Sequence, residues 1–370
     1  MREKEIAQKL LKKAGVEING DRPCDIQVHN EGLYARVLKD GSLGLGEAYL
    51  DGWWDAESLD NFFAKVLRAH LDKDITFNFT DSLMYLKVVF LNLQSKLRSQ
   101  KVAKEHYDLS YQLYESFLDP YNQYTCGYFK DINDLNLAQE QKLDLICRKL
   151  QLKPGDRVLD IGCGWGGFAN YAAKNFGCHI TGVTISEEQY KYAKKFCQDL
   201  PVEILKKDYR DLQGKFDKIL VCGMIEHVGM KNYSGFMRKV ESLLDKKGLF
   251  LLHTIGGNES KIAPDAWMNK YIFPGGMLPS MKRLTRATEG VLVMEDWHNF
   301  GQDYDLTLMA WYRNFEKNWS KIKENYDQRF YRMWKYYLLS SAGAFRARDM
   351  QLWQIVFSKN GVSGGYTCVR

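Results

Sequence analysis

The sequence has none of the long hydrophobic runs that mark a membrane-spanning protein. None of its 370 residues belongs to an uncharged apolar run of about 18 residues or more, the length that a transmembrane helix needs. Residues 1–5 are largely charged where a signal peptide would have an apolar stretch. We therefore expect a cytoplasmic protein.

Paired cysteines and repeats are also missing. The eight cysteines are scattered without paired spacing, which argues against a disulfide framework and against a zinc site. The sequence has no internal repeat and no low-complexity segment. Hydrophobic residues make up 45% and charged residues 26% of the chain, the balance of a globular protein. The formal net charge of +6 suits an anionic membrane surface as well as nucleic acid.

The length of the chain predicts two units, one of them small. Residues 1–92 indicate a mainly helical N-terminal domain of short helices and turns, with an amphipathic stretch at 5–13 and an aromatic, glycine-punctuated centre around 41–46 and 53–54. Apolar residues recur at helical spacing over 81–99, and basic residues follow. This pattern favours either an amphipathic helix for the bilayer surface or a helix that covers the small domain and leads into a linker at 93–104.

Residues 105–370 change to alternating apolar strands and amphipathic helices. We expect strands at 157–161, 179–183, 202–206, 218–221, 249–254, 291–296 and 353–358, and helices at 165–175, 187–198 and 233–244. This alternation predicts an α/β fold, a doubly wound Rossmann-like sheet that is mostly parallel, with one antiparallel strand.

A glycine-rich turn at 160–167 follows the first of these strands and opens a helix. Glycines there allow a tight turn and let a ligand approach the backbone. Dinucleotide sites share such a turn, but they also have an acidic residue at the end of the second strand. Residues 182–186 contain no carboxylate, which argues against a dinucleotide.

An acidic residue before the glycines and a second acid after the third strand are instead typical of a class I methyltransferase. Its ligand, S-adenosylmethionine, has a sulfonium, an amino acid, a ribose and an adenine, but no phosphate. We predict that Asp208 accepts a hydrogen bond from the adenine amino group and that Tyr209 packs near the ring. The alternative is a strand-to-helix turn without a ligand. It explains less well why the strand, the glycines, the helix and the two acidic residues occur together in this order.

Further segments extend the pattern to the substrate. The stretches 106–110, 124–129, 224–229, 251–256 and 343–349, with 41–47 and 49–54 near the N-terminus, closely resemble the bacterial cyclopropane-fatty-acyl-phospholipid synthases. The resemblance covers nearly the whole chain. The mycolic acid cyclopropane synthases are more distantly similar and lack the two N-terminal stretches.

The resemblance implies transfer of the methyl group of S-adenosylmethionine to a cis double bond of an unsaturated phospholipid acyl chain. The carbocation loses a proton to bound bicarbonate and closes to a cyclopropane ring. The family's bicarbonate ligands correspond to Cys126, Glu226, His253, Ile255 and Tyr304, with Cys126 and Ile255 acting mainly through their backbone. Glu226 would accept the hydroxyl proton of the anion, while His253 and Tyr304 would donate to it. Without the resemblance, His253 would be interpreted as a core histidine.

The motif and the resemblance together define the expected cofactor site. Gln189 is expected to bind the ribose hydroxyls, and His106 and His227 are expected to have structural or supporting roles. The predicted cofactor residues are Tyr124, Thr125, Asp160, Gly162, Cys163, Gly164, Trp165, Gly166, Thr184, Gln189, Asp208 and Tyr209.

The segment 256–289 interrupts the sheet and is rich in large apolar side chains, which can form the wall of an acyl channel. Aromatic rings such as those of Tyr271, Phe273, Tyr304 and Trp311 can stabilise a carbocation, each by about 0.5–2 kcal/mol, although such rings are more often ordinary core.

Many family members have a cysteine where this chain has Ser341. The mechanism needs no thiol, so we expect an active enzyme.

We expect unsaturated phospholipid chains in a bilayer as partners, rather than nucleic acid, with transient binding at the inner face of the cytoplasmic membrane. The N-terminal domain is predicted to provide membrane docking and homodimer contacts.

Two alternatives remain at this stage. One is a methyltransferase of the same fold that makes a branched or hydroxylated lipid or methylates a small amine. The other is a non-enzymatic membrane scaffold.

Overall fold

A seven-stranded mixed sheet forms the larger of two units in the computed structural model, which describes residues 2–71 and 111–370. This sheet unit contains residues 111–260, Gly276–Asp303 and Gln351–Arg370, and the helical unit contains the described N-terminal residues with Lys261–Gly275 and Tyr304–Met350. The expected linker at 93–104, the expected helix at 81–99 and His106 lie outside the described residues.

The strand order of the sheet is β5-β4-β3-β6-β7-β9-β8. Neighbouring strands from β5 to β7 pair in parallel, and β8 pairs antiparallel with β9. This is the mostly parallel α/β sheet that the sequence predicts. The strands are β3 (Arg157–Ile161), β4 (His179–Thr184), β5 (Val202–Lys206), β6 (Phe216–Cys222), β7 (Leu244–Gly257), β8 (Val293–Asn299) and β9 (Met350–Ser358).

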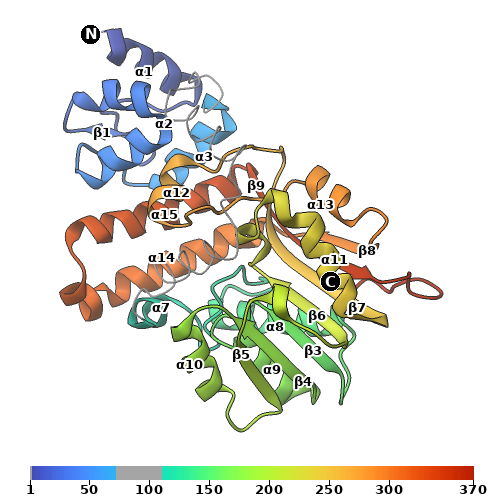
Figure 1. Ribbon diagram of the computed structural model, residues 1–370. Coiled ribbons are helices and arrows are strands. Elements are labelled where there is room, and N and C mark those ends of the chain that lie inside the picture. The colour runs from blue at the N-terminus through green and yellow to red at the C-terminus, as the bar shows by residue number, and fades with distance from the viewer. Residues whose placement is uncertain (1, 72–110) are drawn as a thin grey trace. The chain divides into compact units, whose positions relative to one another are not determined.

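Helices cover both faces of this sheet (Figure 1). The helices of this unit are α7 (Tyr111–Phe117), α8 (Leu135–Lys149), α9 (Gly167–Phe176), α10 (Glu187–Phe196), α11 (Tyr233–Leu243) and α13 (Met281–Thr288), with short 3₁₀ turns η1 (Tyr209–Asp211), η2 (Ile225–His227) and η3 (Met230–Asn232). Side chains accept hydrogen bonds from backbone N–H groups at several helix starts, as Asp134 does at α8 and Ser186 at α10. Such caps satisfy donors that lack a partner within the helix.

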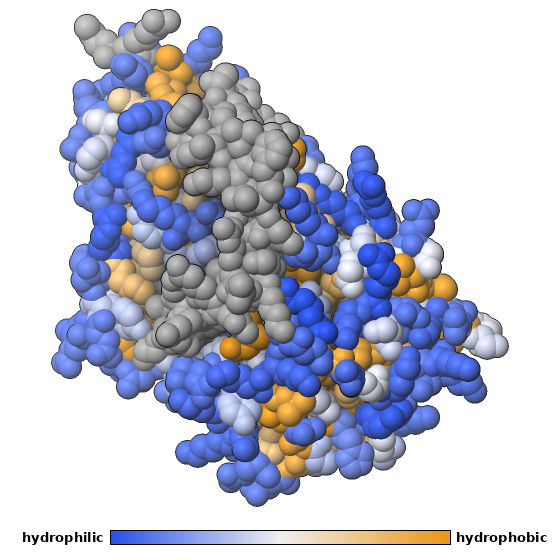
Figure 2. Space-filling model, viewed as in Figure 1, coloured by the Kyte–Doolittle hydropathy of each residue, from blue (hydrophilic) through white to orange (hydrophobic). Residues whose placement is uncertain are grey.

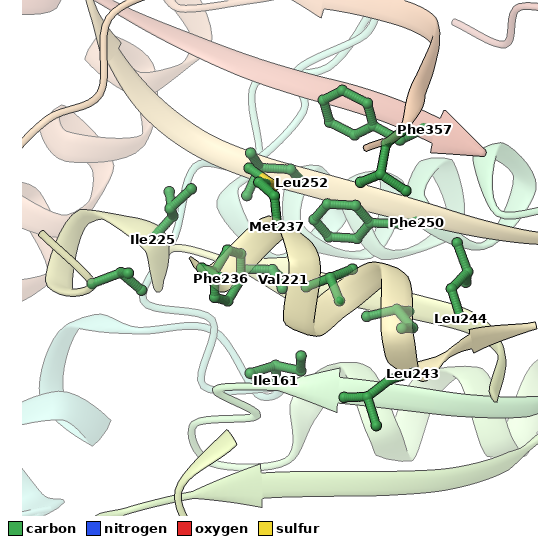
Figure 3. Packing of buried hydrophobic residues seen from close by; sticks show 14 of the residues in the cluster. Ile161, Val221, Ile225, Phe236, Met237, Leu243, Leu244, Phe250, Leu252 and Phe357 are labelled. Carbon is green, nitrogen blue, oxygen red and sulfur yellow. The ribbon is translucent and has the colours of Figure 1, made fainter. Parts of the chain in front are cut away.

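Alternate residues of the strands point to opposite faces, and each face has its own core. Leu159, Val221 and Leu252 pack with α11 and α13, as Figure 3 shows for part of this cluster. Val158 and Leu251 pack on the other face with α8 and α9. A parallel sheet buried on both faces produces the nearly continuous apolar strands on which the prediction rested.

The helical unit combines three separate stretches of the chain. It contains α1 (Arg2–Lys13), α2 (Gly32–Leu50), α3 (Leu59–Arg68), α12 (Ala266–Tyr271), most of α14 (Gln302–Ile322), η4 (Lys323–Asn325) and α15 (Gln328–Arg346), with a small sheet of β1 (Gln27–Val28) and β2 (Trp54–Asp55). Helix α15 packs against α2 and α3, and α12 packs against α2. The N-terminal helices therefore share their core with segments far along the chain.

The glycine-rich stretch 41–46, the glycine-punctuated centre of the predicted short helices and turns, is part of α2. The helix is kinked at Gly41, which has φ 56° and ψ −131°. A Cβ atom at Gly46 would lie 2.3 Å from the indole of Trp267. Close packing by α12 thus explains glycine inside a helix.

Among the described residues, none of the helices combines the length and hydropathy that are needed to cross a bilayer. All eight cysteines lie in the described part of the chain and are free thiols, and six of them are buried. Ser341 is a buried residue of α15.

Candidate active site

The glycine turn after β3 has the backbone conformation that the sequence predicts. Gly162, Gly164 and Gly166 all have positive φ angles, of 84°, 53° and 84°, which glycine adopts without strain. A Cβ atom at Gly167 would lie 2.0 Å from the carbonyl oxygen of Tyr121, so this position requires glycine because of crowding. Among the described residues, no atom beyond its own chain neighbours lies within 4 Å of a Cβ built on Gly164.

A pocket of about 220 Å³ lies beside this turn, at the carboxyl ends of β3, β4 and β6. All predicted cofactor residues except Gly166 line it. Gly166 is instead the first residue before α9, and a Cβ atom there would lie 3.0 Å from Ala193 of α10. The structure thus brings together predicted residues from four sequence segments (124–125, 160–165, 184–189 and 208–209) at the sheet edge where α/β folds bind ligands.

Asp160 lies in this pocket and is almost fully buried. Burial raises the pKa of its carboxyl group to about 7, although the positive charge of Lys142 lowers it. A carboxylate here would balance a cationic ligand that displaces water from the pocket.

Gln189 is oriented by Thr184, its neighbour in the pocket. The Thr184 hydroxyl donates a hydrogen bond of 2.8 Å to Gln189 Oε1. The hydroxyl in turn accepts a bond of 3.2 Å from the backbone N–H of Ser186. Because the amide oxygen is occupied, Gln189 presents its Nε2 donor, which matches the predicted contact with ribose hydroxyl oxygens.

Asp208 forms a local ion pair in the same pocket. Its Oδ1 accepts bonds of 2.9 Å and 2.8 Å from the backbone N–H and Nε of Arg210, and its Oδ2 accepts one of 2.8 Å from Nη2. The guanidinium group also lies 5.4 Å from the ring centroid of Tyr209. An adenine amino group would therefore share the Asp208 carboxylate with Arg210, a pocket residue that sequence reasoning missed.

Two buried polar side chains of α8 hold the pocket segment 123–125. Gln139 Nε2 donates to the carbonyl oxygen of Thr125 over 2.8 Å. Lys142 Nζ donates to the hydroxyl of Thr125 over 3.0 Å and to Gln123 Oε1. Both side chains are fully buried. This anchor, which we call the α8 anchor (Gln139 and Lys142), was not predicted because polar residues in a helix usually indicate a solvated face.

Glu226, in η2, contacts the end of β7. Its Oε1 accepts a hydrogen bond of 2.8 Å from the backbone N–H of Ile255. Its Oε2 is buried and has no hydrogen-bond partner among the described residues. Burial raises the pKa of Glu226, although the Ile255 N–H and the Thr254 hydroxyl lower it. The backbone N–H of Ile255, which was predicted to bind the anion, thus donates to Glu226 in this structure.

His253 lies on β7 and is also buried. Its Nδ1 is 3.2 Å from Gln354 Nε2, and its Nε2 has no partner within the described chain. Burial lowers its pKa well below the ordinary value, so the ring is neutral. His253 and Glu226 therefore each have one buried, unpaired polar atom, which is rare in proteins and points to a missing polar ligand.

The remaining predicted residues occupy different places. Cys126 is buried, and its thiol donates to the carbonyl oxygen of Gly127 over 3.1 Å. Tyr304 belongs to the helical unit, where its ring lies 4.5 Å from that of Phe345. His227 lines the pocket, and burial lowers its pKa to about 4.

Comparisons with known proteins extend this description. The model of the mycolic acid cyclopropane synthetase family matches residues 94–355. The chain is 54% identical over 365 residues to cyclopropane-fatty-acyl-phospholipid synthase of Escherichia coli strain K12, a match that covers 99% of this chain and 95% of the relative. It is 35% identical to sphingolipid C9-methyltransferase A of Emericella nidulans over 73% of this chain and 56% of the relative.

Among solved structures, a mycolic acid cyclopropane synthase complexed with SAH and CTAB is 28% identical, with a TM-score of 0.66 over 70% of this chain and 98% of that one. The sheet order, the glycine turn and these matches agree with one another. The chain therefore belongs to the mycolic acid cyclopropane synthetase family.

Proposed function

We propose that this protein transfers the methyl group of S-adenosylmethionine to the cis double bond of unsaturated phospholipid acyl chains and forms a cyclopropane ring. The observation that carries the proposal is the match to cyclopropane-fatty-acyl-phospholipid synthase over 99% of the chain, together with a pocket whose lining matches the predicted cofactor site. The scaffold alternative lacks support, since the pocket residues are intact.

The pocket residues fit S-adenosylmethionine, which supplies the methyl group to be transferred. Asp160 provides a buried carboxyl group for the cationic end of the cofactor. Gln189 presents an amide donor for the ribose, and Tyr209 offers a ring face for the adenine. Tyr114, Tyr124 and Trp165 form an aromatic wall, with ring centroids of Tyr114 at 5.4 Å from Tyr124 and 5.7 Å from Trp165.

The unpaired atoms of Glu226 and His253 fit a small oxyanion, and we propose bicarbonate, with Cys126 and Ile255 as further ligands. The role of Tyr304 as a ligand stays a prediction, because Tyr304 belongs to the other unit. Bound bicarbonate would supply a base for the single proton that the reaction releases. Neutral His253 would donate from Nε2. Glu226 would accept at Oε2, the oxygen that Ile255 leaves unoccupied. A neutral donor and a buried acceptor orient such an anion without a thiol, so Ser341 is compatible with activity.

The experiment that tests this function combines the purified protein, labelled S-adenosylmethionine and vesicles of unsaturated phospholipid. We expect the acyl chain to gain one CH₂ unit and to show the high-field NMR signals of a cyclopropane methylene group. A methyl-branched product would instead support the second candidate, which the similarity to a sphingolipid C9-methyltransferase favours. Unchanged lipid would contradict both proposals.

We further propose that the helical unit provides bilayer docking and homodimer contacts, at the cytoplasmic face of the membrane. Helix α1 supports docking: its apolar Ile6 is exposed, and its last turn carries Lys12 and Lys13. Trp54 does not support it, because the ring is buried in the unit core. On the face shown in Figure 2, the coloured residues are mostly hydrophilic, with small separate apolar patches.

The docking prediction can be measured by vesicle co-sedimentation of the full chain. We expect binding to anionic phosphatidylglycerol vesicles that weakens with added salt, since attraction of lysines to an anionic surface is screened by ions. Replacing Ile6 with Asp should weaken it further. Phosphatidylcholine vesicles serve as the control, and equal binding of both vesicle types at all salt concentrations would argue against this prediction.

A further inference from the structure

Gln354 is the hydrogen-bonding neighbour of His253 on the adjacent strand β9. Both side chains are almost fully buried. The amide nitrogen of Gln354 lies 3.2 Å from Nδ1 of His253. An amide nitrogen donates hydrogen bonds and does not accept them. In a neutral imidazole, Nδ1 must then be the acceptor, and the proton is carried by Nε2.

The surroundings of His253 keep the ring uncharged. Burial is the main cause of the lowered pKa of His253, and the positive charges of Lys142 and Lys149 on α8 lower it further. The ring of Phe300, which follows β8, lies edge-on at 6.0 Å. On the Nδ1 side of the ring, Gln354 is the hydrogen-bonding neighbour among the described residues.

We propose that Gln354 is a positioning residue that fixes His253 in the Nε2–H tautomer, so that a neutral donor is presented to the bound oxyanion. The opposite tautomer would direct a lone pair at the anion and repel it. A histidine without a partner at Nδ1 would divide its population between the two forms. Only the catalytic consequence rests on the proposed function, because the tautomer itself is a property of the buried pair.

The residue type at position 354 is informative. A carboxylate there would accept a hydrogen bond from Nδ1–H, which would draw the proton to Nδ1 or stabilise the imidazolium ion. Glutamine has the same length, but it donates. Its Oε1 is buried without a partner among the described residues, so the hydrogen bond to His253 engages this side chain through its nitrogen.

The test is a two-bond ¹⁵N–¹H correlation spectrum of the histidine rings in the full-length protein, with the signals of His253 assigned by their loss in His253→Asn. We expect the Nε2–H pattern in the wild type. Gln354→Glu should shift the pattern to Nδ1–H or to the doubly protonated ring, and it should lower turnover by about 10-fold or more. A wild-type Nδ1–H pattern, or an unchanged pattern in Gln354→Glu, would overturn the proposal.

Gln351→Leu is the matched control, since Gln351 is a buried glutamine of the same strand whose Oε1 bonds to Asn299. This variant should keep the tautomer of His253 and the affinity for S-adenosylmethionine. It thus separates a specific effect of residue 354 from a general disturbance of β9. If the spectra behave as expected but no variant or wild type produces a cyclopropane, the proposed reaction fails while the tautomer assignment stands.

Discussion

Replacing Glu226 with Gln is expected to lower turnover by about 100-fold or more, the usual range for loss of a group that handles a proton, without weakening cofactor binding. Glutamine keeps the size of the side chain, and its Oε1 can still accept from the backbone N–H of Ile255. Its Nε2 would replace the unpaired Oε2 with a donor that can neither accept a hydrogen bond nor take up a proton. Turnover can be followed with labelled S-adenosylmethionine and unsaturated vesicles, and affinity by calorimetry.

Glu241→Gln provides the control for this substitution. Glu241 lies on α11 in the same unit and pairs with Lys359 at 2.7 Å, away from the pocket lining. We expect its turnover to remain near that of the wild type. Near wild-type turnover in Glu226→Gln would remove Glu226 from the reaction, and a parallel loss of cofactor affinity would assign it to binding instead.

Lys142→Met is expected to weaken binding of S-adenosylmethionine by about 10-fold or more, equivalent to about 1.4 kcal/mol. Methionine fills a similar volume but cannot donate to Gln123 and Thr125, which would leave the pocket segment without half of the α8 anchor. Both partners line the pocket, so their displacement changes its wall directly. Calorimetric titration of the cofactor measures the effect.

Lys149→Met is the matched control for this prediction. Lys149 is also a fully buried lysine of α8, but it contacts His298 Nδ1 at 3.0 Å and Asp296 at 3.8 Å, both on β8. If the loss of a buried ammonium group destabilises the fold in general, the free energy of unfolding should fall in both variants. Only Lys142→Met should also lose affinity for S-adenosylmethionine. Equal loss in the two variants would count against a specific role of the α8 anchor.

The strands were predictable wherever burial on both faces makes them apolar. The bounds of β3 and β5 agree with the prediction, and β7 contains its predicted core. Strand β7 begins earlier than predicted, at Leu244. Its first residues include the exposed Lys246 and Lys247, and because these residues are polar, the sequence pattern did not indicate a strand there. For residues 41–46 the sequence predicted only a glycine-punctuated centre among short helices and turns. Contact with α12, distant in sequence, explains the glycine within α2.

The cofactor pocket was predictable because its residues cluster in short motifs at strand ends. The side chains that support these motifs were not. Gln139, Lys142 and Gln354 are polar residues inside a helix or strand whose partners lie elsewhere in the sequence, so their burial depends on the tertiary fold. Tyr304 and the stretch 261–275 were expected within one catalytic domain, but they cluster with the N-terminal helices.

The composition of the helical unit has a consequence for synthesis on the ribosome. Its N-terminal helices pack on α15, where the ring of Tyr336 lies 5.4 Å from Tyr49 and 5.2 Å from Phe63. A domain usually folds as soon as its own residues have emerged, but these helices cannot complete their core until α15, which ends at Arg346, has been synthesised. The nascent N-terminal segment therefore exposes apolar side chains until that point, and chaperones that bind such segments should have their longest access to it then.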